Sequence, residues 1–199
     1  MVPEHSPTDD VASAMSAIFS LLHNAYGQGY IGEDISQLDH ALQAAAAAQA
    51  AQADDECILA ALFHDIGHLL PADAPQMDGL GVQDHEALGA DFLFEHGVSH
   101  RVAKLVRCHV QAKRYLCWKN PAYATRLSPA SKGTLAWQGG PMIKAEAEAF
   151  EKDPDCKAIL ALRSWDEMAK DPEAEVAPLL AYRDMLSKHL TNNRVAMGK

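Results

Sequence analysis

Apolar side chains return every three or four residues along most of this chain, and two-residue alternation is almost absent. This spacing is typical of amphipathic helices and argues against a sheet. We therefore predict an all-α fold. The pattern predicts helices over about residues 9–25, 35–52, 54–70, 83–96, 99–116, 156–169 and 178–190, with irregular chain over about 117–142.

Local signals set several of these helix ends. Asp54 and Ser99 are N-cap candidates, because their side-chain oxygens can accept hydrogen bonds from the first turn. Pro71 and Gly97 follow predicted helices as stop signals. The run of alanine over residues 44–53 is interpreted as a closely packed helix, since alanine is the best helix former and has a small side chain.

Length and composition indicate one domain. The chain has 199 residues, of which 48% are apolar and 22% are charged, which is ordinary for a globular protein. No shift in composition divides it, so residues 1–199 are expected to form one domain. The ends, about 1–8 and 191–199, are expected to fray.

The charge makes some partners improbable. With 27 acidic and 17 basic residues the formal net charge is −10, which disfavours a nucleic-acid partner. The apolar runs are far shorter than the roughly 20 residues that cross a bilayer, and the first residues lack a secretion signal, so a cytoplasmic protein without membrane contact is expected. The four cysteines form no CxxC pair and are expected to be reduced thiols. A monomer is favoured, although the sequence does not determine the oligomeric state.

The segment HDIGH carries the strongest chemical signal. His64 and His68 stand four residues apart on one face of a predicted helix, and Asp65 follows His64. The neighbouring residues are apolar, so the helix has little surface to give to solvent. A buried carboxylate with two imidazoles is costly unless its charge is compensated, and a metal ion commonly does this. The alternative, polar residues facing water, is disfavoured by those neighbours.

The order of histidines and acids along the chain adds a resemblance. His40, then His64 with Asp65, then Asp166 follow the order H…HD…D. This order resembles that of the HD-domain superfamily, a helical metal-binding fold. Two further histidines would supply a second metal ion, with Asp65 placed to bridge the two. The resemblance then implies six metal ligands: His40, His64, Asp65, His85, His109 and Asp166.

Longer segments narrow the resemblance. The motifs are YIGE, QLDHALQ, HVQAKRY, LSPASKGTLAWQGGPM and RSWDE. Together, over about residues 30–189, they resemble the HD-domain diiron oxygenases that cleave the carbon–phosphorus bond of 1-hydroxy-2-aminoethylphosphonates. The resemblance implies two iron ions in the Fe(II)/Fe(III) state and O2 as co-substrate. Nitrogen and oxygen donors suit iron or manganese better than thiophilic ions.

The same resemblance assigns roles. It places His64, Asp65 and Tyr30 in the catalytic centre, and Tyr30 and Glu33 near the amino end of the substrate. Asp34, next to Glu33, is a further candidate for this role, and its alternative is to cap the following helix. The resemblance assigns five residues to the phosphonate group: His68, Lys113, Ser131, Thr134 and Arg163. Spacing supports two of these, because Lys113 follows His109 by four residues and Arg163 precedes Asp166 by three, so each cation shares a helix face with an expected ligand.

These observations lead to a ranked expectation of function. The adjacent acids Glu33 and Asp34 favour a trimethylammonium group, so the expected substrate is [1-hydroxy-2-(trimethylammonio)ethyl]phosphonate, giving phosphate and glycine betaine. One alternative is the free amine, 2-amino-1-hydroxyethylphosphonate, giving glycine and phosphate. The others are an HD-domain phosphohydrolase that uses metal-bound hydroxide and a non-catalytic helical module that senses a ligand.

Overall fold

The computed structural model describes residues 7–30, 34–70, 75–196 and 198. All regular elements in this part of the chain are helices, apart from two isolated bridges, Gly29 with Ser36 and Gln76 with Val82. The all-α prediction is confirmed. The α-helices are α1 (Pro7–Asn24), α2 (Gln37–Ala50), α3 (Asp55–Phe63), α4 (His85–Glu95), α5 (His100–Lys119), α6 (Pro121–Arg126), α7 (Pro129–Trp137), α8 (Lys144–Glu151), α9 (Cys156–Met168) and α10 (Arg183–Ala196). Short 3-10 turns are η1 (Ala25–Gly27), η2 (Ile66–Leu69) and η3 (Leu179–Tyr182).

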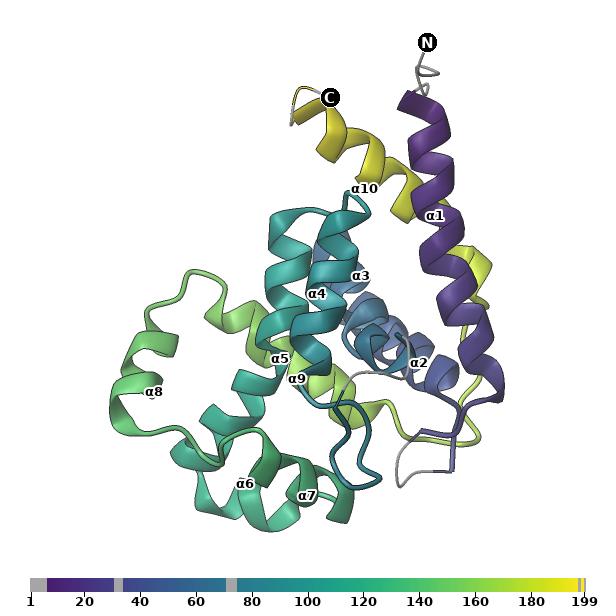
Figure 1. The fold of residues 1–199 in the computed structure, drawn as a ribbon. Helices are drawn as coiled ribbons and strands as arrows, with labels where there is room; N and C mark the ends of the chain where they lie inside the picture. The colour runs from purple at the N-terminus through teal and green to yellow at the C-terminus, as the bar shows by residue number, and fades with distance from the viewer. Residues whose placement is uncertain (1–6, 31–33, 71–74, 197, 199) are drawn as a thin grey trace.

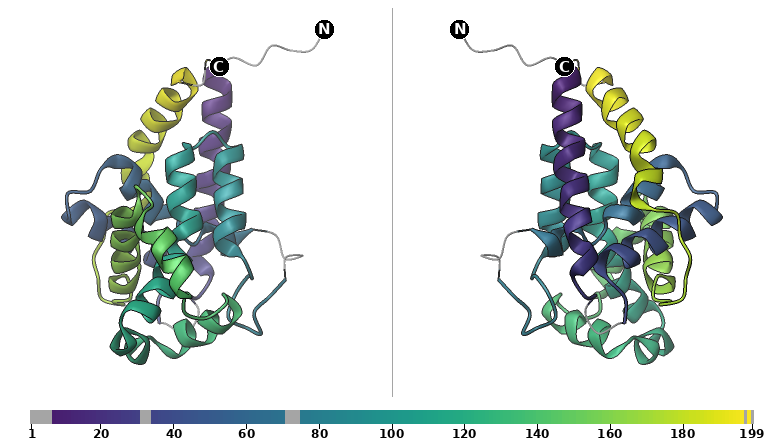
Figure 2. Two further views of the ribbon diagram at one scale, coloured as in Figure 1. Left: turned by 90° about the vertical axis from the view of Figure 1, so that its left-hand side faces the viewer. Right: turned by 90° about the vertical axis from the view of Figure 1, so that its right-hand side faces the viewer.

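The helices pack around α3, which lies against α2, α5 and α9 (Figure 1). Helix α4 packs along α5, and α6 and α7 lie at one end of the molecule. Helices α1 and α10 run side by side at the other end, as both views of Figure 2 show. Among the described residues no helix is both long enough and apolar enough to cross a membrane.

The alanine-rich helix packs as expected. Ala44, Ala45 and Ala48 of α2 have no exposed surface, and α2 contacts both α3 and α9. Small side chains let these helices approach closely. At the start of α2, the Ser36 hydroxyl accepts a hydrogen bond from the Asp39 backbone N–H, which fixes the helix that carries His40.

The predicted helix over 54–70 is wrong in its second half. The predicted N-cap Asp54 is confirmed, since its carboxylate accepts from the Cys57 N–H at 2.8 Å, but α3 ends at Phe63 and the chain continues through a turn into η2. Gly67 explains the break. A Cβ built on Gly67 would lie 1.9 Å from the His85 carbonyl oxygen, so the turn brings the backbone directly against the start of α4.

Substituting Gly67 by alanine is expected to destabilise the fold by about 3 kcal/mol, because the backbone of α4 must move to admit the methyl group. The same movement would displace His85. Thermal unfolding and metal content would both report the change. Gly27→Ala is the matched control, since no heavy atom lies within 4 Å of the added Cβ; equal melting temperatures for the two variants would contradict the close approach.

The irregular chain expected over 117–142 is also wrong in part. Two short helices, α6 and α7, occupy much of it, and α8 follows unpredicted. Pro121 and Pro129 each stand in the first turn of a helix, where the missing N–H is not needed. Asn120 and Ser128 cap these helices.

Helix α10 continues to Ala196, into the segment 191–199, which was expected to fray. The Asn193 side chain donates to the Gly97 carbonyl at 2.9 Å, and Arg194 pairs with Asp10 of α1 at 2.7 Å. These contacts hold the last turns. Two other end signals are confirmed: Ser99 caps α5, and Gly97 follows α4 with a φ of +83°.

Candidate metal centre

The six predicted ligands converge from five places in the chain. His40 comes from α2, His64 and Asp65 from the turn after α3, and the rest from α4, α5 and α9. The four histidines and Asp166 are buried, and the Asp65 side chain is 12% exposed. Helices far apart in sequence therefore bring these side chains into one buried cluster.

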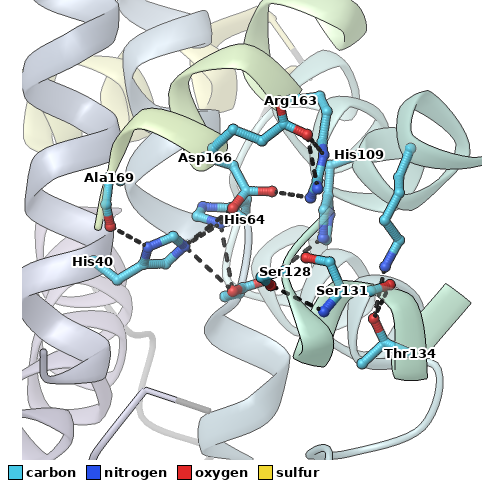
Figure 3. Close-up of polar contacts among 12 residues, drawn as sticks. His40, His64, His109, Ser128, Ser131, Thr134, Arg163, Asp166 and Ala169 are labelled. Carbon is cyan, nitrogen blue, oxygen red and sulfur yellow. Dashed lines mark hydrogen bonds and ion pairs between the residues drawn. The ribbon is translucent and has the colours of Figure 1, made fainter. Parts of the chain in front are cut away.

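One half of the cluster contains His40 and His64. Their Nε2 atoms lie 3.0 Å apart. The Asp166 Oδ1 atom lies 3.4 Å from His40 Nε2 and 3.8 Å from His64 Nε2 (Figure 3). Neighbouring ligand atoms on one metal ion with bonds of about 2.1 Å would be about 3 Å apart, so this spacing suits a shared ion.

The other half contains His85 and His109, whose Nε2 atoms lie 3.3 Å apart. Asp65 stands between the two pairs. Its Oδ1 atom is 3.4 Å from His85 Nε2 and 3.5 Å from His109 Nε2. Its Oδ2 atom is 3.6 Å from His40 Nε2 and 3.4 Å from His64 Nε2. Each oxygen of one carboxylate therefore faces a different histidine pair.

Backbone hydrogen bonds fix which ring nitrogens face inward. The Nδ1 atoms of His40, His64 and His109 donate to the carbonyls of Ala169, Ala61 and Val106, at 2.7, 2.8 and 2.7 Å. In a neutral imidazole the Nε2 atom then carries a lone pair. Lone pairs that point at one another across about 3 Å need a positive charge between them, and ligand histidines in proteins characteristically use their other nitrogen this way. The donor set fits metal ions.

The two carboxylates are anionic. Burial by itself would raise the pKa of Asp166, but the Arg163 guanidinium and a hydrogen bond with His40 hold that pKa well below its usual range. Burial opposes ionisation of Asp65 as well, yet the surrounding imidazoles, His64 first and then His85, hold its pKa well below the usual range. Such buried anions are commonly compensated by bound cations.

His68 lies beside the cluster with a different tautomer. It comes from η2, so it does not share a regular helix face with His64 as the sequence suggested. Its ring stacks on His85, and its Nδ1 atom accepts from the Val82 N–H at 3.1 Å. The Nε2 atom of the neutral ring is therefore protonated, which suits an anionic ligand better than a metal ion, although Asp65, His68 and His85 are close enough to form a metal-binding group.

A pocket of about 60 Å³ opens beside the cluster. Its described lining includes all five residues predicted to bind the phosphonate: His68, Lys113, Ser131, Thr134 and Arg163. Lys113 is buried, and its ammonium donates to the Thr134 hydroxyl at 2.8 Å. Burial, followed by the charge of Arg163, lowers the pKa of Lys113 to about 8.

Arg163 is held by more partners than the sequence indicated. Its Nη1 atom lies 2.5 Å from Asp166 Oδ2, and its Nε atom donates to the Tyr123 hydroxyl at 3.0 Å. Glu167 accepts from the same guanidinium at 3.0 Å and from the Tyr123 hydroxyl. Five further polar residues of this region were not predicted from the sequence: Tyr123, Ser128, Gln138, Glu167 and Lys170. Glu167 and Lys170 follow Asp166 closely enough to have been considered, whereas nothing local marks Tyr123.

Of the residues predicted to contact the amino end of the substrate, only some lie at the pocket. Tyr30 lines the pocket and stacks on His40 with ring centroids 3.9 Å apart. The Lys170 ammonium lies 5.9 Å from the Tyr30 ring centroid. Asp34 is exposed and is not among the described lining residues, and Glu33 lies outside the described residues. Of these three residues, the structure places Tyr30 at the pocket and Asp34 away from its described lining.

The remaining described histidines, His23, His96, His100 and His189, do not line this pocket. His189 accepts from the Ser99 N–H, and His96 donates to the Phe92 carbonyl. The site and the fold together define a helical metal-binding protein whose ligands follow the order H…HD…D.

Comparison with known proteins gives the family. The HD domain matches residues 38–178, which contain all six clustered side chains. The [1-hydroxy-2-(trimethylamino)ethyl]phosphonate dioxygenase (glycine-betaine-forming) of Leisingera caerulea is 39% identical over 168 residues, covering 81% of this chain and 84% of that protein. The hydroxymethylphosphonate dioxygenase of Gimesia maris is 38% identical over 170 residues, 84% of each chain. An uncharacterised protein of Acanthamoeba polyphaga mimivirus is 37% identical over 190 residues, 93% of this chain and 87% of the viral one. The chain belongs to the HD-domain family, within the group of phosphonate dioxygenases that the two bacterial relatives represent.

Proposed function

We propose that this oxidoreductase uses O2 and two iron ions to cleave the carbon–phosphorus bond of a 1-hydroxyphosphonate and release inorganic phosphate. The position of Asp65 carries the proposal. One carboxylate faces His40 and His64 with one oxygen and His85 and His109 with the other, as a ligand shared by two ions would. A mononuclear phosphohydrolase has no use for the second histidine pair.

The donors divide between two ions. His40, His64 and Asp166 would hold the first, His85 and His109 the second, and Asp65 both. Imidazole and carboxylate donors suit iron. When bound, such a pair supplies the redox chemistry that activation of O2 requires.

The chain's own side chains would hold the substrate. Lys113 and Arg163 bring positive charge to the phosphonate oxygens, and the two cations differ in use: guanidinium binds as a fixed fork, whereas ammonium acts as a point charge. The Thr134 hydroxyl orients the Lys113 ammonium through their 2.8 Å hydrogen bond. His68 offers its Nε2–H, and Ser131 its hydroxyl. The small volume of the pocket excludes most water, which strengthens each of these contacts.

The first proposed substrate is [1-hydroxy-2-(trimethylammonio)ethyl]phosphonate, with glycine betaine as the second product. Its support is the similarity to the Leisingera dioxygenase, the aromatic face of Tyr30 and the acid Glu33. The free amine, giving glycine, follows the same scheme. The second candidate is hydroxymethylphosphonate, supported by the Gimesia dioxygenase and by Lys170 near the Tyr30 ring, which places a cation where an ammonium group would lie.

We also propose that the protein is a monomer located in the cytoplasm.

One experiment tests the function. The iron-loaded enzyme, with reductant and air, is given the trimethylated, free-amine and hydroxymethyl compounds, and O2 consumption and phosphate release are recorded together. We expect both signals with at least one compound, two iron ions per chain, and no phosphate under nitrogen. Phosphate released anaerobically from a phosphate ester would identify a hydrolase instead.

Glu33→Ala is expected to raise the KM for the trimethylated substrate by about tenfold, with iron content unchanged, because the variant loses a carboxylate at the cationic end. The exposed Asp34 lies outside the described lining, so Asp34→Ala should change that KM much less. Steady-state kinetics with metal analysis would measure both variants. Loss of iron in Glu33→Ala would count against a substrate role for Glu33.

A further inference from the structure

A second cavity continues outward from the metal pocket. It has a volume of about 410 Å³ and lies between the α6–α7 segment and the end of α9. Four residues line both spaces: Ser128, Ser131, Arg163 and Lys170. We call this space the outer cavity. Its remaining described lining residues are Tyr123, Arg126, Leu127 and Glu167.

The outer cavity has a local charge opposite to that of the whole protein. Arg126, Arg163 and Lys170 are cationic, and Glu167 is the one acid among its described lining residues. The Arg163 guanidinium is balanced by the Glu167 carboxylate at 3.0 Å and by Asp166 at 2.5 Å, so the positive charge of the outer cavity comes from Arg126 and Lys170. A chain with a net charge of −10 thus presents a positive cavity beside its metal pocket. Such a contrast concentrates small anions locally.

Arg163 forms the wall between the two spaces. One edge of its guanidinium pairs with Asp166 beside the metal ligands, while Tyr123 and Glu167 hold the rest from the outer side. These partners keep the planar group in one orientation. Figure 3 shows Arg163 directed at Asp166, with Ser128 and Ser131 adjacent in the same region. The Ser128 oxygen accepts from the Ser131 N–H at 3.2 Å, which leaves its own hydroxyl hydrogen available to a ligand.

The two volumes suggest different uses. The inner pocket, at about 60 Å³, has room for one compact group, whereas the outer cavity is several times larger and is bordered by the exposed Arg126. An anion that leaves or approaches the metal pocket past Ser131 and Arg163 enters a space that is itself positively charged.

We propose that the outer cavity is a second anion site, which binds a tetrahedral phosphate-type dianion through Arg126, Lys170 and the Ser128 hydroxyl. The dianion is the phosphonate before it enters the metal pocket or the inorganic phosphate after it leaves. The identity of that anion rests on the proposed function, but the site does not.

Inorganic phosphate is the probe of the site itself. In isothermal titration with the metal-loaded enzyme, we expect two phosphate ions per chain, one at each space. Arg126→Gln should weaken the second binding event by about tenfold and leave the first unchanged. Lys170→Gln should weaken it as well. Arg183→Gln, an exposed arginine of α10 that lines neither space, is the matched control. One phosphate per chain in the unsubstituted enzyme, or equal isotherms for Arg126→Gln and Arg183→Gln, would overturn the site.

Kinetics separate the two sources of the anion. If the site receives substrate, Arg126→Gln lowers kcat/KM for the hydroxyphosphonate about tenfold at low ionic strength, leaves kcat unchanged and flattens the salt dependence. If it receives product, the variant instead relieves inhibition by added phosphate. Absence of turnover with every phosphonate would refute the proposed function and leave the titration result standing.

Discussion

Asp65→Asn is expected to reduce turnover by more than about 100-fold and to lower the metal content below two ions per chain. Asparagine keeps the size of the side chain but replaces one of the two oxygens, which face different histidine pairs, and removes the negative charge. Losing only an outer partner of a metal ligand already costs about 10- to 100-fold. Metal analysis and phosphate release would be measured on the same sample.

The fold should survive this change, because Asp65 is a turn residue whose neighbours in α3 remain packed. Circular dichroism would verify it. Asp91→Asn serves as control, since Asp91 is an exposed acid of α4 paired with Arg107 at the surface. Two metal ions bound per chain at wild-type affinity in Asp65→Asn would refute the bridging role.

Lys113→Gln is expected to raise the KM for the phosphonate about 10- to 100-fold, the usual range for losing a charged hydrogen bond. Burial and the nearby Arg163 lower the pKa of Lys113 from 10.5 to about 8. The ammonium is therefore charged below pH 8 and is lost as the pH rises above it. The KM of the unsubstituted enzyme should accordingly increase between pH 7.5 and 9.5, whereas the KM of Lys113→Gln should be high and nearly flat.

The control for this profile is Lys119→Gln, an exposed lysine on the same helix that pairs with Glu151. It should keep the pH-dependent KM of the parent enzyme. If Lys113→Gln retained the alkaline rise in KM, another group would cause that rise. Deprotonation of Lys113 would then not be what weakens phosphonate binding.

Several structural results could be reached from the sequence. Periodicity predicted the helices that carry His40, His85, His109 and Asp166. Asp54, Ser99 and Gly97 marked helix ends because capping is a local interaction. The resemblance to the HD-domain oxygenases named six side chains as metal ligands, and the structure gathers these six in one buried cluster.

Other results depended on contacts between distant segments. The end of α3 at Phe63 follows from the approach of Gly67 to the His85 carbonyl, which no local pattern contains. Helices α6 and α7 were missed because they have only 6 and 9 residues, too few for a clear helical period. The outer partners of Arg163, Tyr123 and Glu167, come from α6 and from α9, and the Tyr123 contact has no signal in sequence spacing.

The sequence by itself determined the helical class, the resemblance to HD-domain oxygenases and the identity of the clustered side chains, since these depend on periodicity and residue type. The tertiary structure decided how those side chains are aimed: Asp65 between two histidine pairs, ring nitrogens fixed by the carbonyls of Ala61, Val106 and Ala169, and Asp34 turned to solvent. Direction is set by backbone geometry and by packing across helices, and neither is encoded in the spacing of residues along one helix.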